Sequence, residues 1–493
     1  MSAVAAVRRV ELADYPLDAE LLRRVPAPMA RRLGVLALSV EDGVVRVAMR
    51  DPGDVVALDE LSRVLGSPVR ALAADRDELD SILIGAYSRT GEIRRLAAAL
   101  QRELEARREA CGDATGSALD SADDAPVVQL LENVFAEAMQ TGASDVHLQP
   151  MEGGFRIRYR VDGFLDGHFV DRPSIYPALV LRLKLMADMD IAERRLPQDG
   201  RLMIAIGDRH LHVRVATMPS RHGEAVVLRL ANAMAQAMDL PQLGLDAEDI
   251  VAIERVLADP HGMLAVVGPT GSGKTTTLNA LLARLDDSRR KLVTVEDPVE
   301  CQLDHGIQVQ VNPRIGLGFS EVLRSALRHD PDVLMVGEVR DRETAEISMR
   351  AALTGHLVLT TVHCNDAAAC VPRLLDMGVA QYMLSSALRL VIAQRLLRRL
   401  CPHCSRPQRA PAAVREWAQR VGGIELKEHL HCAVGCNRCK RSGYQGRIGV
   451  YELLRFQDGE AVGDGRLVRA AVTQAQHGHT SIDEVLRVFG AVQ

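Results

Sequence analysis

Aromatic residues are scarce in this chain: tryptophan, tyrosine and phenylalanine make up 3% of its 493 residues, and there is a single tryptophan. Recognition of nucleic-acid bases by stacking on aromatic side chains is therefore not expected. The sequence also lacks any run of the roughly eighteen apolar residues that a membrane-spanning helix needs. Its first residues, MSAVAAVRRVELADYP, fit no signal peptide, because two arginines and then acidic residues interrupt the apolar stretch. These absences predict a cytoplasmic protein that contacts a membrane only through partners.

There is no excess of basic charge either. Lysine and arginine number 60 against 65 aspartate and glutamate residues, which gives a formal net charge of −5. This balance differs from that of a dedicated nucleic-acid binder, so no nucleic-acid partner is expected. The apolar fraction of 47% and the charged fraction of 25% are typical of globular proteins, and the length suggests about three domains.

Composition and periodicity divide the chain into four parts. Two apolar runs separated by an EDG turn predict a hairpin and, with the helical patterns that follow, a small α/β N-terminal domain over 1–90. A charged helix and a flexible linker rich in Gly, Ser, Ala and Asp are expected over 91–125. Alternating segments with DG turns predict an α+β middle domain over 126–236. Over 237–493, apolar runs such as MLAVVG and DVLMVGEV alternate with helical segments, which indicates a parallel sheet built from βαβ units.

The segment GPTGSGKTTT satisfies the phosphate-binding pattern G-x-x-x-x-G-K-[S/T] directly after one of these apolar runs. Its glycines allow backbone N–H groups to turn toward phosphates, and the helix that follows adds its positive N-terminal end. Lys274 would reach the β- and γ-phosphates, and Thr275 would hold Mg²⁺. The predicted nucleotide-binding residues are Gly268, Pro269, Thr270, Gly271, Ser272, Gly273, Lys274, Thr275 and Thr276.

A glutamate follows another predicted strand of the same domain. The segment DVLMVGEVRD ends its apolar run at Gly337 and Glu338, where NTPases place the group that handles Mg²⁺ or the attacking water. Because the usual aspartate is absent, we expect Glu338 to polarise water rather than to bind the metal. The alternative is a surface glutamate after a core strand.

Two further segments place polar side chains after strands. VTVEDPVE carries Glu296, Asp297 and Glu300, and side chains at the carboxyl ends of parallel strands point into the crevice where ligands bind. The alternative for these acidic residues is a simple turn. His356 and His363 stand at the two ends of the strand LVLTTV, where they could sense the γ-phosphate or be structural residues.

Nine cysteines in a chain without a secretion signal favour metal binding over a disulfide framework. CPHC and CNRC form two CxxC pairs, which predict a structural Zn²⁺ site in a subdomain over 397–445 with the ligands Cys401, Cys404, Cys436 and Cys439. Nearby residues that could substitute as ligands, or be bystanders, are Cys432, His403, His429 and His431. No sequence spacing typical of metal ligands includes Cys111, Cys301, Cys364 or Cys370. The segment RLLRRL before the first pair is predicted to be a helix with one solvated face.

Four segments in order resemble the boxes of the secretion ATPase superfamily: the phosphate-binding loop at 268–275, the acidic segment 294–300, the strand 333–338 and the histidine segment 354–363. GASDVHLQP, RYRVDG and HVRVATMPS resemble the domain that precedes these boxes in the family. GYQGRIGVYE after the second cysteine pair resembles the end of the family's zinc subdomain. The resemblance covers nearly the whole chain and, in length and layout, is greatest to the type II secretion ATPases.

The resemblance implies an α/β fold with a RecA-like P-loop ATPase domain, a PAS-like middle domain and a ring of six chains. It implies ATP, Mg²⁺ and Zn²⁺ as ligands. Arg214 and Arg229 correspond to middle-domain arginines that reach the nucleotide, with Arg201 as a further candidate. The family's HGERVV reads HGEAVV here, so Ala225 replaces one arginine. The catalytic residues implied in this way are Glu338, Lys274, Arg214, Arg229, Glu296 and His363. Three further arginines match positions that the family uses near the nucleotide or the ring interface: Arg324, Arg328 and Arg340. The alternative for each is a solvated helix face.

The function that the resemblance implies is ATP hydrolysis that powers protein export by a type II secretion system. The N-terminal domain would dock on the cytoplasmic part of a platform protein of the bacterial inner membrane. In some relatives this domain binds cyclic di-GMP, but a single RRLG segment without a second copy does not indicate that ligand here. The alternatives are a type IV pilus extension motor, a DNA-transfer ATPase and a nucleotide-gated scaffold with little turnover.

Overall fold

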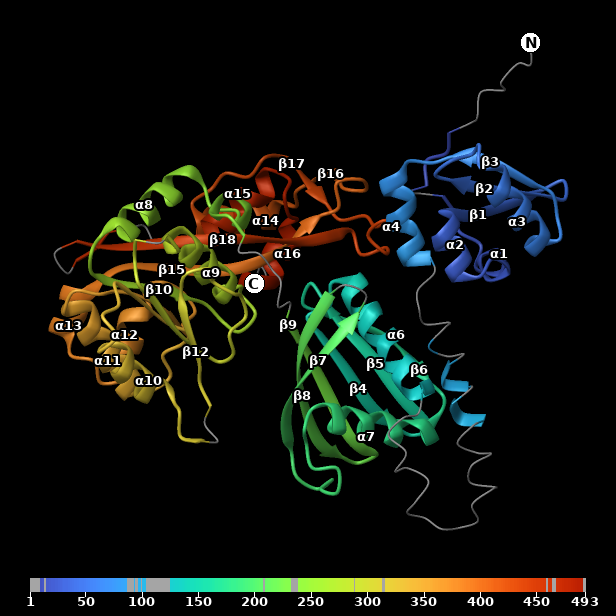
Figure 1. Cartoon of the computed structure of the whole chain (residues 1–493). Coiled ribbons are helices and arrows are strands. Elements are labelled where there is room, and N and C mark those ends of the chain that lie inside the picture. Colours follow the sequence, from blue (N-terminus) through green and yellow to red (C-terminus); the bar gives the residue numbers. More distant parts are fainter. Residues whose placement is uncertain are drawn as a thin grey trace. The chain divides into compact units, whose positions relative to one another are not determined.

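The computed structural model contains two compact units, drawn together in Figure 1. One consists of residues 1–231 with 401–405 and 433–444, and the other consists of 232–400, 406–432 and 445–493. No described helix is long and apolar enough to cross a membrane. The predicted linker, and much of the charged helix before it, lie outside the described residues. Those described are 9–12, 15–86, 93, 96–98, 100–102, 125–206, 209–231, 238–287, 289–312, 315–457, 460–462 and 467–490.

The N-terminal domain is a small sheet packed with short helices. Its elements are α1 (Ala19–Arg24), α2 (Ala27–Leu33), β1 (Val35–Glu41), β2 (Val44–Met49), α3 (Val55–Leu65), β3 (Val69–Ala73) and α4 (Arg76–Ala86). β1 and β2 pair antiparallel across the EDG turn, and β3 then pairs with β2 in parallel. The Asp54 side chain caps α3 by accepting a hydrogen bond from the Ala57 N–H at 3.0 Å. The hairpin and the helices predicted for this domain are confirmed.

The middle domain is a six-stranded antiparallel sheet with two helices on one face. Its elements are α6 (Ala125–Thr141), β4 (Asp145–Met151), β5 (Gly154–Val161), β6 (Phe164–Val170), η1 (Pro173–Ile175), α7 (Tyr176–Met186), β7 (Gln198–Ile206), β8 (Arg209–Ser220) and β9 (Gly223–Ala231). The strand order is β6-β5-β4-β9-β8-β7. Apolar side chains of alternate strand residues pack with α6 and α7 in one core, which leaves the polar residues on the opposite face.

The second unit is built on an eight-stranded sheet whose central strands are parallel. The elements of its first half are η2 (Leu240–Leu243), α8 (Ala247–Ala258), β10 (Gly262–Val267), α9 (Lys274–Leu285), β11 (Leu292–Glu296), β12 (Ile307–Gln310), α10 (Phe319–Ala326), β13 (Val333–Val336), α11 (Arg342–Leu353) and β14 (Leu357–Val362). The parallel pairs among β10 to β14 confirm the predicted βαβ units. β10, β11, β13 and β14 are buried along their whole length, and separate apolar cores form on the two faces of the sheet.

The second half of the unit completes the sheet and covers it. Its elements are α12 (Cys370–Asp376), α13 (Gln381–Ala387), β15 (Leu388–Leu400), β16 (Arg406–Arg409), α14 (Ala412–Gly422), β17 (His429–Cys432), β18 (Tyr444–Gln457), β19 (Glu460–Val462), α15 (Leu467–Gln476) and α16 (Ile482–Phe489). The full strand order is β12-β11-β13-β14-β10-β15-β18-β19, and β16 pairs with β17 separately. β10, the strand that precedes the predicted phosphate-binding loop, therefore lies near the middle of the sheet.

The helix predicted for RLLRRL is wrong, because this segment is the end of strand β15. β15 pairs in parallel with β10, and its Val391 and Ile392 are buried in the cores on opposite faces of the sheet. The arginines near its end are not a solvated helix face: the Nε and Nη2 atoms of Arg398 donate to the buried Glu484 carboxylate at 2.9 and 2.7 Å. The spacing of apolar and basic residues imitates a helix, but the segment continues the strand whose first part, Leu388–Ala393, is buried beside β10.

Candidate functional site

The predicted phosphate-binding loop connects β10 to α9, and its backbone has the conformation that such a loop needs. Gly268, Gly271 and Gly273 have positive φ values of 156°, 78° and 88°, which other residues rarely adopt. A Cβ atom at Gly273 would lie 2.8 Å from Nε2 of Gln394, whose Oε1 accepts a hydrogen bond from buried Thr277 at 2.7 Å. Glycine at these positions therefore lets the backbone approach a ligand closely.

Side chains of the loop supply the donors that nucleotide phosphates require. The Nζ atom of Lys274 donates to the carbonyl oxygens of Gly268 and Pro269, each at 3.0 Å. Burial lowers the pKa of Lys274, while the nearby Glu338 carboxylate acts in the opposite direction. The buried Ser272 hydroxyl has no hydrogen-bond partner within the described part of the chain, and Thr275 is exposed at the start of α9. These donors fit triphosphate, and the Thr275 hydroxyl fits Mg²⁺.

The other predicted side chains lie at the same edge of the sheet. Glu296 ends β11, Glu338 follows β13, and His363 follows β14, while Gly268 follows β10. These strands are neighbours in the order β11-β13-β14-β10, and their carboxyl ends meet where the loop begins. The sheet topology therefore brings the acidic, histidine and phosphate-binding segments to one edge.

Glu338 is held by two neighbours. One oxygen, Oε1, lies 2.5 Å from Nη2 of Arg340, and the other, Oε2, lies 3.4 Å from Nε2 of His363. Its side chain is only 14% exposed. The backbone beneath it is also fixed, since the Gly337 N–H donates to the Val295 carbonyl at 2.8 Å. The carboxylate is thus oriented at the edge of the sheet that carries the phosphate-binding loop.

Arg340, expected either near the nucleotide or ring interface or on a solvated helix face, is a neighbour of Glu338. It lies in the loop before α11, and its hydrogen bond to the Glu338 carboxylate raises the pKa of its guanidinium group. The signal in the sequence was that Arg340 follows Glu338, the glutamate at the end of a predicted strand, by two residues. Arg324 instead pairs with Glu343 on the exposed surface.

The two histidines around β14 have different surroundings. His356 lies before the strand, where its Nδ1 atom is 3.0 Å from the carbonyl oxygen of Ala351 at the end of α11. The six residues of β14, which span about 20 Å, separate His356 from the edge of the sheet where Glu338 lies. His356 therefore fits the structural alternative, whereas His363 contacts Glu338.

Glu296 is more enclosed than a turn residue would be. It is 4% exposed, and its Oε1 atom accepts hydrogen bonds from the Thr294 hydroxyl at 2.6 Å and from Nε2 of Gln308 at 3.2 Å. Burial raises the pKa of Glu296, although both hydrogen bonds act in the opposite direction. Glu296 is thus a buried, oriented carboxyl group at the end of β11.

The predicted arginines of the middle domain form one row across its sheet. Arg214 on β8 lies opposite Arg201 on β7 and opposite Arg229 on β9. Arg229 in turn lies opposite Asp145 on β4, which lies opposite Arg160 on β5. The Nε atom of Arg229 is 3.1 Å from Asp145, and the Nε atom of Arg160 is 3.9 Å from it. The row therefore places four arginines and one aspartate next to one another across this face of the sheet.

The two CxxC pairs form a single four-cysteine cluster. Sγ–Sγ distances are 3.9 Å for Cys401–Cys436 and 3.8 Å for both Cys404–Cys439 and Cys436–Cys439. Four thiolates around Zn²⁺ at about 2.3 Å would be about 3.8 Å apart in a tetrahedron. These cysteines are buried, and their four Sγ atoms all lie within 4.8 Å of one another. The donor set fits a structural zinc ion.

The suggested substitute ligands do not join this cluster. It contains only the four cysteines among the residues whose positions the structure describes. The ring of His403 contacts the guanidinium group of Arg438, with Nδ1 at 3.1 Å from Nη1. Cys432, His429 and His431 lie on β17.

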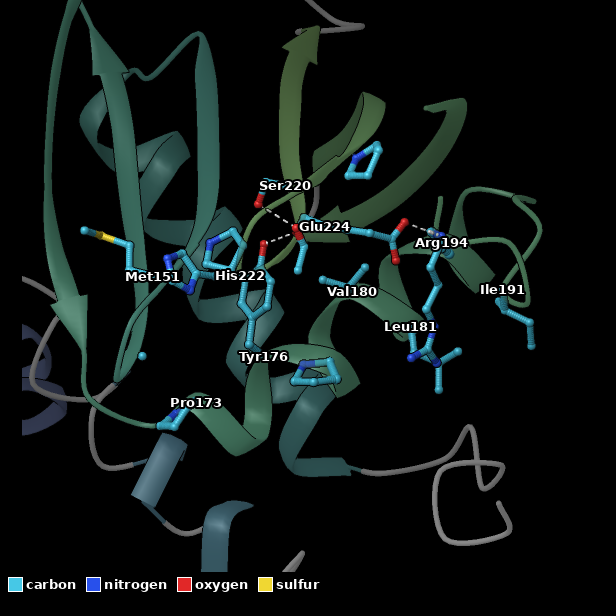
Figure 2. A pocket seen from close by; sticks show the side chains of 16 residues that line it. Met151, Pro173, Tyr176, Val180, Leu181, Ile191, Arg194, Ser220, His222 and Glu224 are labelled. Atoms are coloured by element: carbon cyan, nitrogen blue, oxygen red, sulfur yellow. Dashed lines mark hydrogen bonds and ion pairs between the residues drawn. The ribbon is translucent and has the colours of Figure 1, made fainter. Parts of the chain in front are cut away.

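The middle domain also contains a cavity of about 230 Å³, shown in Figure 2. The Tyr176 hydroxyl donates to the carbonyl oxygens of Leu148 and Glu224 at 3.0 and 2.6 Å. The Glu224 carboxylate pairs with the buried Lys184 ammonium group. This pairing neutralises both charges, and none of the predicted site residues lines the cavity. The cavity is therefore separate from the candidate nucleotide site.

Comparison with solved structures identifies the fold. The ATPase DotB of Legionella pneumophila has a TM-score of 0.54 at 21% identity, covering 73% of this chain and 95% of that chain. The pilus retraction motor PilT, solved with bound ADP, has a TM-score of 0.50 at 24% identity, covering 73% and 96%. At these identities the likeness shows the fold alone, which is that of RecA-like secretion ATPases, as predicted.

Sequence comparison adds the family. The chain is 42% identical over 451 residues to Type II secretion system protein E of Pseudomonas aeruginosa, covering 91% of this chain and 89% of that protein. It is 39% identical over 509 residues to Type II secretion system ATPase E of Vibrio cholerae, covering 97% and 99%. Type IV pilus assembly ATPase PilB of Myxococcus xanthus is 38% identical over 462 residues, covering 92% and 80%.

Two family descriptions match successive parts of the sequence. Residues 5–93 match the MshEN domain, and residues 120–487 match the description Type II/IV secretion system protein. The second match includes the phosphate-binding loop, the Glu338 edge and the four-cysteine cluster. The chain therefore belongs to the type II/IV secretion system protein family.

Proposed function

We propose that this protein hydrolyses ATP to ADP and phosphate and uses the energy to drive protein export by a type II secretion system. The observation that carries the proposal is the placement of Glu338 between Arg340 and His363, at the sheet edge that carries the phosphate-binding loop. A protein that only bound nucleotide would need the loop but would have no use for a fixed carboxylate beside it. The phosphate-binding loop and the fixed Glu338 carboxylate together favour ATP hydrolysis over a nucleotide-gated scaffold with little turnover.

Each residue of this edge has a separate task in the proposed mechanism. Lys274 exchanges its two backbone carbonyl partners for phosphate oxygens, and Thr275 holds Mg²⁺. When bound, the metal neutralises charge that develops on the phosphates. Glu338 accepts a hydrogen bond from the attacking water and takes up its proton, while Arg340 and His363 keep the carboxylate oriented. No covalent protein intermediate is required.

The row of arginines on the middle-domain sheet would supply further positive charge to the transition state. Arg214 and Arg229 lie side by side on β8 and β9, so one movement of the domain would carry both guanidinium groups. Positive charge brought to the γ-phosphate stabilises the transition state of phosphoryl transfer. We infer that six chains form a ring in which domain rotation couples each hydrolysis to mechanical work. Glu296 would orient polar groups at the same edge.

Replacing Arg214 by alanine is expected to lower kcat about 100-fold, because Arg229 would still supply part of the stabilising charge. Nucleotide affinity should change much less, since the loop provides most of the ground-state contacts. The measurement is steady-state phosphate release together with binding of a fluorescent ATP analogue. Arg156→Ala is the matched control, since Arg156 is an exposed arginine on β5 of the same sheet. Equal kcat values for Arg214→Ala and Arg156→Ala would contradict the assigned role.

The cellular role is proposed from the relatives. Type II secretion system proteins E are about 40% identical to the chain and cover most of it. The proposed partner is the cytoplasmic part of an inner-membrane platform protein, which would bind the N-terminal domain. The protein would then work at the cytoplasmic face of a bacterial inner membrane, with Zn²⁺ stabilising the four-cysteine subdomain. A type IV pilus extension motor is the second candidate because PilB is 38% identical over 92% of the chain.

A deletion strain distinguishes the two candidates. Loss of this protein should leave exported enzymes inside the cell envelope while surface pili remain, and the wild-type gene should restore export. A gene encoding Lys274→Ala should fail to restore it, because the loop lysine is needed for ATP use. Normal export combined with loss of surface pili would instead support the pilus extension motor.

A further inference from the structure

Strand β15 carries a buried glutamine beside the phosphate-binding loop. Gln394 is only 1% exposed, although its side chain is polar. β15 pairs in parallel with β10, and Ala393 lies opposite Val267, the last residue of β10 before the loop. Gln394 therefore stands level with Gly268, where the loop begins. Because a buried amide without hydrogen-bond partners costs free energy, a glutamine at this place in the sheet needs partners that hold it.

The side chain of Gln394 is bonded to the first turn of α9. Its Oε1 atom accepts a hydrogen bond from the Thr277 hydroxyl at 2.7 Å, and Thr277 is fully buried. The backbone N–H of Thr277 donates to the carbonyl oxygen of Gly273 at 3.1 Å. Two successive hydrogen bonds thus connect β15, through the start of the helix, to the last glycine of the loop.

Gln394 also lies directly against the first and the last glycine of the phosphate-binding pattern. A Cβ atom at Gly268 would be 2.7 Å from the Gln394 carbonyl oxygen, and one at Gly273 would be 2.8 Å from Nε2 of the same residue. Leu396, which projects from the same side of β15, would be 3.4 Å from the Cβ atom at Gly273. Both ends of the loop backbone are therefore packed against one residue of the neighbouring strand.

Such packing matters because the loop itself is rich in glycine. Gly268, Gly271 and Gly273 all have positive φ values, and glycine has access to many other backbone conformations. Backbone N–H groups bind phosphate only when the loop forms its cradle, with Lys274 directly after Gly273. If only a fraction of the molecules holds this conformation, the apparent affinity for nucleotide falls by that fraction.

We propose that Gln394 is a positioning residue of the nucleotide site, which holds the loop in its phosphate-binding conformation before ATP arrives. Its amide and the Thr277 hydrogen bonds fix Gly273 from two sides, and its carbonyl supports Gly268. The proposal rests on nucleotide binding by the loop, as the proposed function does, but not on hydrolysis. Because Gln394 acts on the loop and not on Glu338, its loss should weaken ATP binding and leave the chemical step nearly unchanged.

The test compares variants that remove the two ends of this hydrogen bond. Gln394→Leu removes the amide at similar volume, and Thr277→Val removes only the hydroxyl. Each should raise Kd for a fluorescent ATP analogue and KM for ATP about tenfold, with kcat within about threefold of wild type. The double variant should be little weaker than the weaker single variant, because both changes break one interaction. Thr277→Ser, which retains the hydroxyl, should bind the analogue within about twofold of wild type.

Thr480→Val is the matched control for loss of a buried hydroxyl. Thr480 is fully buried, and its hydroxyl donates to the carbonyl oxygen of Arg398 at 2.8 Å, further along β15 and away from the loop. It should lower Tm about as much as Thr277→Val without changing Kd. Thermal unfolding and analogue binding are measured for the full chain of every variant.

The outcomes separate positioning from packing and from the proposed function. Wild-type Kd in Thr277→Val with a lower Tm would show that the contact only stabilises the fold, and would overturn the proposal. Lower kcat at unchanged Kd, or fully additive losses in the double variant, would overturn it as well. If Gln394→Leu does not fold, Thr277→Val against Thr277→Ser decides the same question. Weaker binding in the variants, together with a wild-type protein that binds the analogue but hydrolyses no ATP, would support positioning and contradict the proposed function.

Discussion

Replacing Glu338 by glutamine is expected to lower kcat for ATP hydrolysis about 100- to 1,000-fold while leaving nucleotide affinity within a few-fold of wild type. Glutamine keeps the size and hydrogen-bonding capacity of the side chain but cannot take up the proton of the attacking water. It also loses the charge that holds Arg340 at 2.5 Å and attracts His363. The binding of ATP depends on Lys274 and the loop backbone, which the substitution does not touch.

Glu343→Gln is the matched control for this prediction. Glu343 is exposed in the first turn of α11, and its carboxylate pairs with Arg324 rather than with any residue of the edge. Its replacement should leave kcat within about twofold of wild type, since exposed ion pairs contribute little. Phosphate release and nucleotide binding are measured for both variants. A Glu338→Gln protein with wild-type kcat would remove Glu338 from the mechanism.

Replacing Cys404 by serine is expected to abolish stoichiometric zinc binding and to lower the stability of the protein. The four sulfur atoms lie within 4.8 Å of one another, with three pairs at 3.8 to 3.9 Å, and a hydroxyl group is a poor fourth ligand for a thiolate zinc site. Because zinc binding contributes directly to folding, we expect a loss of about 2 kcal/mol or more, or roughly 4 to 8 °C in Tm. Metal analysis and thermal unfolding of the full chain measure the two effects.

Cys432→Ser separates a ligand effect from a general effect of losing a thiol. Cys432 is partly exposed at the end of β17, close in sequence to the second pair but outside the cluster. This variant should retain one zinc ion per chain and the wild-type Tm. Chelation of wild-type zinc should reproduce the instability of Cys404→Ser. If both serine variants keep their zinc, or both lose it, the assignment of the ligands is contradicted.

Much of the fold could be predicted because its strongest signals are local. MLAVVG contains no polar side chain, and only two β-branched threonines interrupt the apolar run LVLTTV. Such runs specify central strands of a parallel sheet without knowledge of their neighbours. Turn residues located the hairpins of the first two domains. The end of β15 could not be predicted in this way, because its alternation of leucine pairs and arginines satisfies a helical period. The segment continues a strand that pairs with β10 over Leu388–Ala393 and neighbours β18 in the sheet, and both of these strands are far away in sequence.

Glu338 and His363 could be predicted as site residues because each follows the end of a strand that the sequence itself indicates. For Arg340 the sequence left two alternatives open, because its contact with Glu338 depends on the path of the loop after β13, which the periodicity of the sequence does not predict. The strand pattern does not distinguish His356 from His363, and the family resemblance implied a role for His363 only. The direction of β14 places His363 at the sheet edge where Glu338 lies.

The most direct test of a ring ATPase is hydrolysis measured against protein concentration for wild type, and for wild type mixed equally with the Glu338→Gln protein. Specific activity should rise with concentration as rings assemble. The mixture should fall well below half of the wild-type value, because inactive chains would also impair active neighbours in the same ring. A specific activity that is independent of concentration, with the mixture at half of wild type, would mean that each chain acts alone and would contradict the account.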